Sequence, residues 1–277
     1  MLAAMPLCAQ SSRGASRGAS AASASSASSA EQSAPKSGVR FVICSPTGES
    51  LPSPLYCKEG KGFREIKISP RTPSRRVRPT GGVVEFWDKD PSEAAADEKG
   101  KKASSAASKK LPDPVFTVKV PEGAGGKMLC IVVPSKSFSK VQTYFLSESG
   151  AAGNLYKVPS KGLHVINFSS FPLKMVTSEK GDFSDPVEKP IGVFRRDEGI
   201  SSKNSWSYTE GADKDGEGKP KRVAFVLMYK DKSNPEFKRF KASQFVVSGR
   251  QAQINLVVKD PERDMPKLLP IQLMEDK

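Results

Sequence analysis

A basic segment in the first third of the chain holds the residues best suited to bind a ligand. Residues 58–78 carry eight Lys and Arg side chains against two acidic ones. The eight are Lys58, Lys61, Arg64, Lys67, Arg71, Arg75, Arg76 and Arg78. Pro70 and Pro73 favour an extended backbone, from which several guanidinium groups could face one polyanion. Phe63 is the one aromatic residue here and is expected to face the core, whereas sites for single-stranded nucleic acid stack bases on several aromatics. The segment predicts polyanion binding, an exposed basic loop, or a processing or modification site, and these three alternatives stay open.

Cysteine spacing suggests one disulfide. Cys44 and Cys57 lie 13 positions apart and flank a stretch rich in Pro, Gly and Ser. Two strands joined by such a loop can bring their Cβ atoms to about 4 Å, as a disulfide requires, so we predict a Cys44–Cys57 bridge. Cys130 lies within an apolar run and is expected to be a buried free thiol. No metal site is predicted, because the chain has no CxxC pair and a single histidine.

The remaining residues predict little catalytic chemistry. His164 is the only histidine, lies in a strand-like run, and has no nucleophile signature near it. The glycines at 123–126 are followed by Lys127 but lack the Ser or Thr of a phosphate-binding loop, so a hairpin loop is predicted there. Carboxylate pairs of a hydrolase can come from any two strands, and that alternative stays open. We therefore expect a non-enzymatic protein with no cofactor, metal or small-molecule substrate.

Alternating hydrophobicity predicts strands throughout the body of the chain. Residues 115–120 place apolar side chains on every second position, which is the period of a half-buried strand. The continuous apolar runs 128–133 and 223–228 predict strands covered on both faces. Three strands at 222–229, 237–247 and 251–258 are expected to form a meander closed by short turns. The predicted fold class is all-β, an antiparallel β-sandwich.

The domain organisation follows from composition. Residues 1–10 look like the remnant of a signal peptide, and residues 11–37 are expected to be a disordered Ser/Ala-rich tether. Two tandem immunoglobulin-like domains are predicted, although one large sandwich is the alternative. Their boundaries are 38–147, with a disordered insertion at 89–112, a linker at 148–154, and 155–277. A duplication supports two halves: residues 39–45 open one and 163–169 the other, with a run of the 128–133 or 223–228 type following in each.

Charge and hydropathy bear on partners and compartment. The net charge of +14 favours an anionic partner, although a solvated lysine-rich surface is the simpler alternative. No apolar run reaches the length that spans a bilayer, so no transmembrane segment is predicted. The opening residues predict export to the periplasm or cell surface. An alternative is lipid modification of Cys8.

The short leader, the Ser/Ala-rich tether and the strand blocks 163–169 and 222–258 resemble immunoglobulin-like exported proteins of gut verrucomicrobial bacteria. Some of those proteins associate with pilus-like surface assemblies. The resemblance covers the body from about Gly38 onward and implies a structural role at the surface or in the periplasm, without an active site. The expected function is adhesion or surface assembly through sandwich edges and loops, by self-assembly or with a protein partner. The alternative is binding of nucleic acid, acidic glycan or lipid by the basic segment.

Overall fold

The structure, a computed structural model, describes most of the chain beyond the leader. The described residues are 37–45, 49–93, 111–134, 141–148, 155–158, 162–179, 181–208, 221–247 and 251–274. They belong to one compact unit, Ala34–Lys277. The predicted leader remnant, almost all of the tether, most of the 89–112 insertion and nearly all of the 148–154 linker lie outside the described residues.

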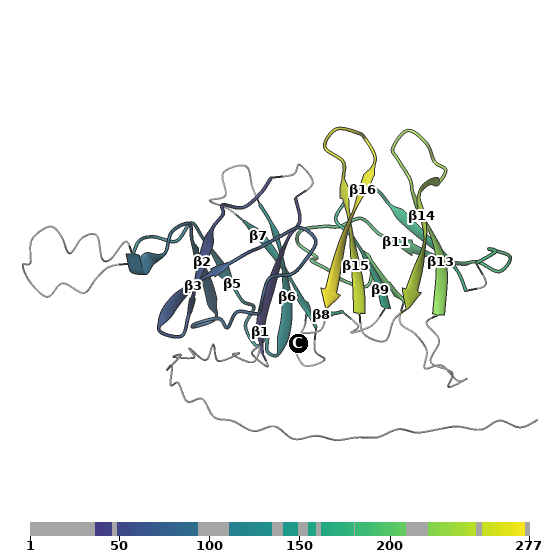
Figure 1. Cartoon of the computed structure of the whole chain (residues 1–277). Coiled ribbons are helices and arrows are strands. Elements are labelled where there is room, and N and C mark those ends of the chain that lie inside the picture. Colours follow the sequence, from purple (N-terminus) through teal and green to yellow (C-terminus); the bar gives the residue numbers. More distant parts are fainter. Residues whose placement is uncertain are drawn as a thin grey trace, which may run out of the picture. The chain divides into compact units, whose positions relative to one another are not determined.

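The regular secondary structure of the described part is almost entirely β-strand, with sixteen strands, many of which are labelled in Figure 1. In chain order they are β1 (Gly38–Ile43), β2 (Leu55–Glu59), β3 (Gly62–Ile66), β4 (Val83–Trp87), β5 (Phe116–Lys119), β6 (Lys127–Val133), β7 (Gln142–Ser147), β8 (Tyr156–Lys157), β9 (Gly162–Asn167), β10 (Leu173–Ser178), β11 (Val187–Ile191), β12 (Ser205–Tyr208), β13 (Lys221–Tyr229), β14 (Lys238–Val247), β15 (Gln251–Lys259) and β16 (Pro266–Met274). The predicted all-β class is confirmed.

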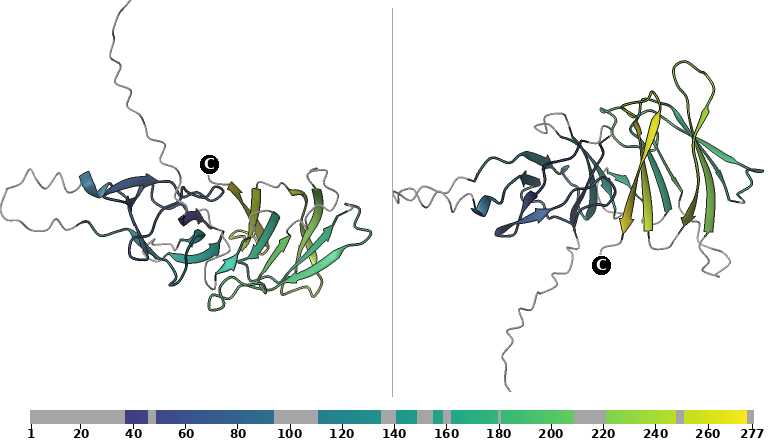
Figure 2. Two further views of the ribbon diagram at one scale, coloured as in Figure 1. Left: turned by 90° about the horizontal axis from the view of Figure 1, so that it is seen from below. Right: turned by 45° about the horizontal axis from the view of Figure 1, so that its top comes forward.

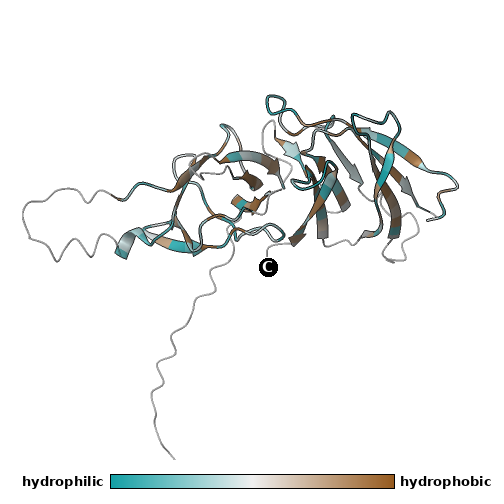
Figure 3. Cartoon of the chain, turned by 90° about the horizontal axis from the view of Figure 1, so that it is seen from above, coloured by the Kyte–Doolittle hydropathy of each residue, from teal (hydrophilic) through white to brown (hydrophobic). Residues whose placement is uncertain are grey.

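These strands form four sheets, two from each half of the chain (Figure 2). Outer sheet 1 has the order β3-β2-β4-β5, and inner sheet 1 has the order β1-β6-β7-β8. Inner sheet 2 has the order β12-β9-β15-β16, and outer sheet 2 has the order β11-β10-β13-β14. Most neighbouring strands are antiparallel, but β1–β6, β7–β8 and β9–β15 are parallel pairs. Hydrophobic residues gather on the strands, and the long loops of the second half are hydrophilic (Figure 3).

Three apolar cores separate the four sheets. The first core lies between outer sheet 1 and inner sheet 1 and contains Phe41, Phe86 and Phe116. The rings of Phe86 and Phe116 stack with centroids 4.6 Å apart, and Phe41 meets Phe86 edge-on at 5.1 Å. The second core lies between inner sheet 2 and outer sheet 2. A middle core joins the two inner sheets through β1, β6, β7, β9, β15 and β16. Each inner sheet is therefore covered on both faces.

The middle core explains one continuous apolar run. On β6, Met128, Cys130 and Val132 face the first core, while Leu129 and Ile131 face the middle core. The prediction for 128–133 is thus confirmed. The run 223–228 on β13 is covered on one face by the second core, but alternate residues on its other face remain partly exposed. The strand of the second half that is covered on both faces is β15.

The two halves share one topology. In the first half β1 pairs with β6 in parallel and β6 with β7 antiparallel, and in the second half β9, β15 and β16 repeat this arrangement. The outer sheets repeat as well, because β3-β2-β4-β5 matches β11-β10-β13-β14. The predicted openers of the two halves, 39–45 and 163–169, are indeed equivalent, as β1 and β9. The strand equivalent to β6 is β15, so 223–228 was the wrong counterpart of 128–133. The division into two domains stays a prediction.

The strand order does not support two finer predictions. An immunoglobulin constant domain places strands A, B, E and D in one sheet and C, F and G in the other. In each half of this chain, the first, sixth and seventh strands of the shared topology (β1, β6 and β7, or β9, β15 and β16) lie in one sheet, and the second to fifth form the other. The immunoglobulin-like assignment therefore gains no support. The predicted C-terminal meander is wrong in its third strand. β13 and β14 form a hairpin, but β15 belongs to inner sheet 2 and pairs with β9 and β16.

Gly38 begins β1 under tight steric limits. Its φ is +133°, and a Cβ built there would lie 2.5 Å from the carbonyl oxygen of Val77. We expect Gly38→Ala to lower the unfolding free energy by about 2 kcal/mol or more, because strained backbone and a backbone clash act together. Urea denaturation measures this. Gly62→Ala is the matched control, since Gly62 has ordinary φ and no atom within 4 Å of its Cβ position. If Gly38→Ala lowers the unfolding free energy no more than Gly62→Ala does, the prediction is contradicted.

Candidate binding groove

The Pro-rich end of the basic segment covers the free edge of β1. We call residues 69–77 the strap. The Val39 and Val77 backbones exchange hydrogen bonds of 2.8 and 2.9 Å, and Ser74 N–H donates to Phe41 O at 2.8 Å. The Ser74 hydroxyl accepts from Phe41 N–H at 2.9 Å, and Ile43 N–H donates to the strap at Ser69 O. An exposed sheet edge can pair with other chains. The strap backbone covers this edge of β1, so its role is structural.

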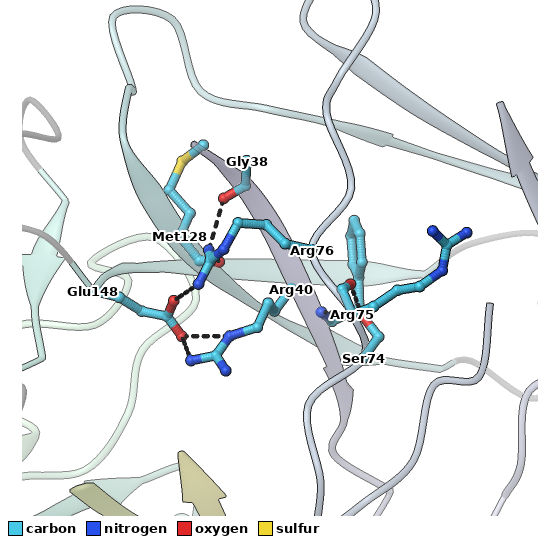
Figure 4. A network of polar contacts seen from close by, with 8 residues as sticks. Gly38, Arg40, Ser74, Arg75, Arg76, Met128 and Glu148 are labelled. Carbon is cyan, nitrogen blue, oxygen red and sulfur yellow. Dashed lines mark hydrogen bonds and ion pairs between the residues drawn. The ribbon is translucent and has the colours of Figure 1, made fainter. Parts of the chain in front are cut away.

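Arg76 turns inward from the strap and enters a buried ionic network (Figure 4). Its Nη2 lies 2.6 Å from Glu148 Oε2, and its Nη1 donates to Gly38 O at 3.0 Å. Arg40, on β1, contacts the other carboxylate oxygen of Glu148 at 2.6 Å. The Arg76 side chain is 1% exposed. It therefore holds the strap to inner sheet 1 and is not available to a polyanion.

Glu59 neutralises two further members of the basic segment. Arg75 Nη1 lies 2.6 Å from Glu59 Oε2, and Arg64 Nη1 lies 3.5 Å from the same oxygen. Arg75 also donates from Nη2 to the backbone oxygen of Glu65 at 3.3 Å. These partly exposed pairs reduce the charge that the segment presents to solvent.

The other five basic residues are exposed, but the structure distributes them over separate places. They are Lys58, Lys61, Lys67, Arg71 and Arg78. Lys58 and Lys61 lie at the turn between β2 and β3. Arg78 borders a pocket beside the glycine-rich loop 123–126. This loop joins β5 to β6, but the two strands lie in different sheets, so the predicted hairpin is wrong. Lys67 and Arg71 line a different groove. The eight residues are therefore not brought together as one polyanion site.

The groove that Lys67 and Arg71 line is a candidate binding site. It has a volume of about 520 Å³ and lies between residues 49–53, residues 66–71 and the first half of β16. This volume is within the usual range for ligand sites, which are mostly apolar with a few polar groups. The apolar lining residues are Ile43, Leu51, Pro52, Ile66, Ile68, Pro70, Leu268, Leu269 and Pro270.

The rim of the groove is basic. Lys67, Arg71 and Lys267 line it, and Glu49 is the one acidic residue among its described lining residues. Gln272 N–H of β16 donates to Arg71 O at 3.1 Å and ties this strand to the strap. Sequence reasoning found Lys67 and Arg71 but missed Lys267 and its neighbours, because nothing in the sequence indicates that residues so far apart meet.

Prolines restrict strand addition beside the groove. The Gln272 N–H points away from β15 and toward the free edge of β16. Pro266 and Pro270 lie an even number of residues from Gln272, so their backbone nitrogens face the same edge. Proline has no N–H to donate there. At the edge of outer sheet 2, β11 carries Pro190. Side chains of the groove are therefore better placed than these two edges to recognise a partner.

The predicted Cys44–Cys57 disulfide is not formed. Both thiols are free and buried, and so is Cys130. Cys44 faces the middle core and Cys57 the first core, so inner sheet 1 separates them. Burial raises the pKa of Cys44 to about 12 and that of Cys57 to about 11, and it raises the pKa of Cys130 as well. These thiols stay protonated at neutral pH and are poor nucleophiles.

His164 lies on β9, on the face that meets inner sheet 1. The alternation shows this, because Leu163 and Val165 belong to the second core and Ile166 to the middle core. The imidazole is fully buried and neither ring nitrogen has a hydrogen-bond partner among the described residues. Burial lowers its pKa to about 4, so the ring is neutral at physiological pH. Among the described residues no cluster of three or more His, Cys, Asp or Glu is arranged to hold a metal ion.

Phe63 differs from its predicted place in the core. It pairs with Lys58 across β2 and β3, on the face opposite Cys57. There its ring meets Trp87 edge-on, with centroids 5.1 Å apart. Phe63 therefore covers Trp87 on the outside of outer sheet 1, beside Lys58, and does not belong to the first core.

No protein-family model matches this chain, and no match was found among curated proteins. In the part of the chain that the structure describes, no helix has the length and apolar character needed to cross a bilayer.

Proposed function

We propose that this chain is a non-enzymatic binding protein whose groove holds an extended segment of a protein partner, with apolar and acidic side chains. The observation that carries the proposal is the groove between the strap and β16, with its apolar floor and basic rim. Apolar side chains of the partner would be removed from water on the floor. Its acidic side chains would meet Lys67, Arg71 and Lys267, which steer association and set orientation.

The chemistry of the described residues favours binding over catalysis. The groove lining includes no His or Cys. The only histidine is buried away from solvent, and the three described thiols have raised pKa values. We place the activity outside the cytoplasm, in adhesion or surface assembly. That placement rests on the leader-like opening, the Ser/Ala-rich segment and the resemblance to exported verrucomicrobial proteins.

Selection of short displayed peptides on the purified protein tests the proposal. We expect the selected peptides to combine apolar residues with Asp or Glu and to bind less tightly as salt is raised. The triple variant Lys67→Glu/Arg71→Glu/Lys267→Glu should weaken their binding by about tenfold or more, because three attractive charges become repulsive. Ile68→Gln should also weaken it by placing a polar group among the apolar lining residues. Fluorescence anisotropy measures both effects.

A matched triple variant, Lys58→Glu/Lys61→Glu/Lys119→Glu, makes the same change in charge away from the groove and should leave binding within about twofold, as expected for surface charges that touch no partner. Equal binding by the groove variant and the unmodified protein would refute the proposed site. The polyanion alternative would be favoured by a different result. In that case a heparin fragment or single-stranded DNA would bind more tightly than any peptide, and the control variant would lose this binding.

A further inference from the structure

One buried asparagine differs from the others in its hydrogen bonds. Asn167 and Asn204 use both ends of their amides, since each donates to backbone oxygens and accepts from a backbone N–H. Asn255 is equally buried, and its Oδ1 accepts from Gln253 Nε2 at 3.2 Å. Its Nδ2 has no partner in the described part of the chain. A buried donor without a partner lowers stability, so this amide calls for an explanation.

Asn255 lies at a pocket in the open side of the second sandwich. It and Gln253 lie on the face of β15 that also bears Val257, which belongs to the second core. The pocket has a volume of about 490 Å³ and is bordered by β14 on one side and by β16 with the loop before it on the other. Phe225, Phe240 and Leu268 are among the apolar residues that line it. The pocket is therefore apolar on its walls, with two amides on β15.

The charged residues at the pocket are mainly basic. Lys241 comes from β14, Lys267 from β16, and Arg263 from the loop between β15 and β16. Asp260, on the same loop, is the one acidic residue among the described lining residues. Three cations against one anion favour a negatively charged ligand group, and the unused Nδ2 of Asn255 is a donor suited to an anionic oxygen.

We infer that this pocket binds a small monocarboxylic acid with an apolar tail. One carboxylate oxygen accepts from Asn255 Nδ2, and the basic side chains at the pocket balance the charge. The apolar tail packs against Phe225, Phe240 and Leu268. The half-buried Gln253 side chain turns aside to let the carboxylate reach Nδ2, which the protein otherwise covers. The site differs from the groove proposed above because it uses residues of β14 and β15, although the two share Lys267, Leu268 and Pro270 of β16.

Octanoate is a suitable probe, and its binding is followed through the side-chain amide signals of Asn255 and Gln253 in the full-length chain by NMR. We expect saturable shifts of both amides and of the Phe240 ring. Asn255→Leu should weaken octanoate binding by about tenfold or more, since a hydrogen bond to a charged group is lost. The same variant should unfold at a urea concentration equal to or higher than the unmodified protein, because it removes an unused donor. Asn167→Leu, which removes satisfied hydrogen bonds, should unfold at lower urea.

Octanol and acetate separate the two parts of the proposed ligand. Each should bind at least about tenfold more weakly than octanoate, since one lacks the carboxylate and the other the apolar tail. Phe240→Trp gives a second variant that narrows the pocket from β14 and should also weaken binding. Octanoate that leaves these signals unshifted, or that binds Asn255→Leu as tightly as the unmodified protein, would overturn the inference. So would octanol binding as tight as that of octanoate, because no carboxylate site would then be needed.

Discussion

Replacing Glu148 by glutamine is expected to lower the unfolding free energy by about 3–5 kcal/mol, as is usual when one partner leaves a buried ion pair. Glu148 is the shared anion between Arg40 and Arg76, with Nη2 to carboxylate distances of 2.6 Å on each side. The three side chains are 11%, 8% and 1% exposed for Arg40, Glu148 and Arg76. Little water can reach the site of the lost carboxylate, so the guanidinium charges remain largely in a medium of low dielectric constant.

Urea denaturation of the purified protein measures the effect. Glu198→Gln is the matched control, because Glu198 meets Arg195 at 3.5 Å where both side chains are exposed, and such pairs contribute less than about 1 kcal/mol. The combined variant Glu148→Leu/Arg40→Leu/Arg76→Met should recover much of the loss, since apolar groups of similar size often replace a buried ionic cluster at little cost. If Glu148→Gln and Glu198→Gln cost the same, the network does not stabilise the strap as argued.

Acid should destabilise the protein through His164 by about 3 kcal/mol. Burial lowers the pKa of His164 in the folded state to about 4, against 6.5 for an unperturbed histidine. Between these two values the unfolded chain binds a proton that the folded chain does not, so the unfolding free energy falls as pH falls. Stability from this group is complete above pH 6.5, is lost progressively below it, and changes no further once the pH is below about 4.

The pH dependence of urea denaturation, compared with His164→Leu, isolates this contribution because His164 is the only histidine. In the unmodified protein, the unfolding free energy should fall between pH 6.5 and 4 by more than the titration of its carboxylates explains. The leucine variant should lack this additional fall. At neutral pH it should be at least as stable, since leucine brings no ring nitrogens into the middle core. Parallel pH curves for the two proteins would mean that His164 is solvated or bonded in the folded state.

Local residue patterns were enough to predict several of the strands, but not β10, β11 or β16. The period of two at 115–120 and the apolar run 128–133 are set by which side chains must leave water, and strands form there as expected. The equivalence of 39–45 and 163–169 was also visible, because β1 and β9 occupy the same place in a repeated topology. The C-terminal meander failed because a turn signal shows only that the chain reverses. It does not show whether the next strand joins the same sheet or crosses to another, as β15 does.

The site depended on contacts that no local pattern contains. Arg75 and Arg76 are adjacent in one basic run, yet alternation along the strap directs one toward Glu59 and buries the other against Glu148. Cys44 and Cys57 have suitable spacing, but opposite faces of one sheet separate them.

The sequence by itself determined an all-β protein with a basic surface, because hydrophobic period and charge are properties of each segment alone. The tertiary structure decided which charges are neutralised inside, that the two inner sheets share a core, and that β16 borders both pockets. Those outcomes depend on pairing between residues far apart in the chain, which the free energy of the whole fold selects.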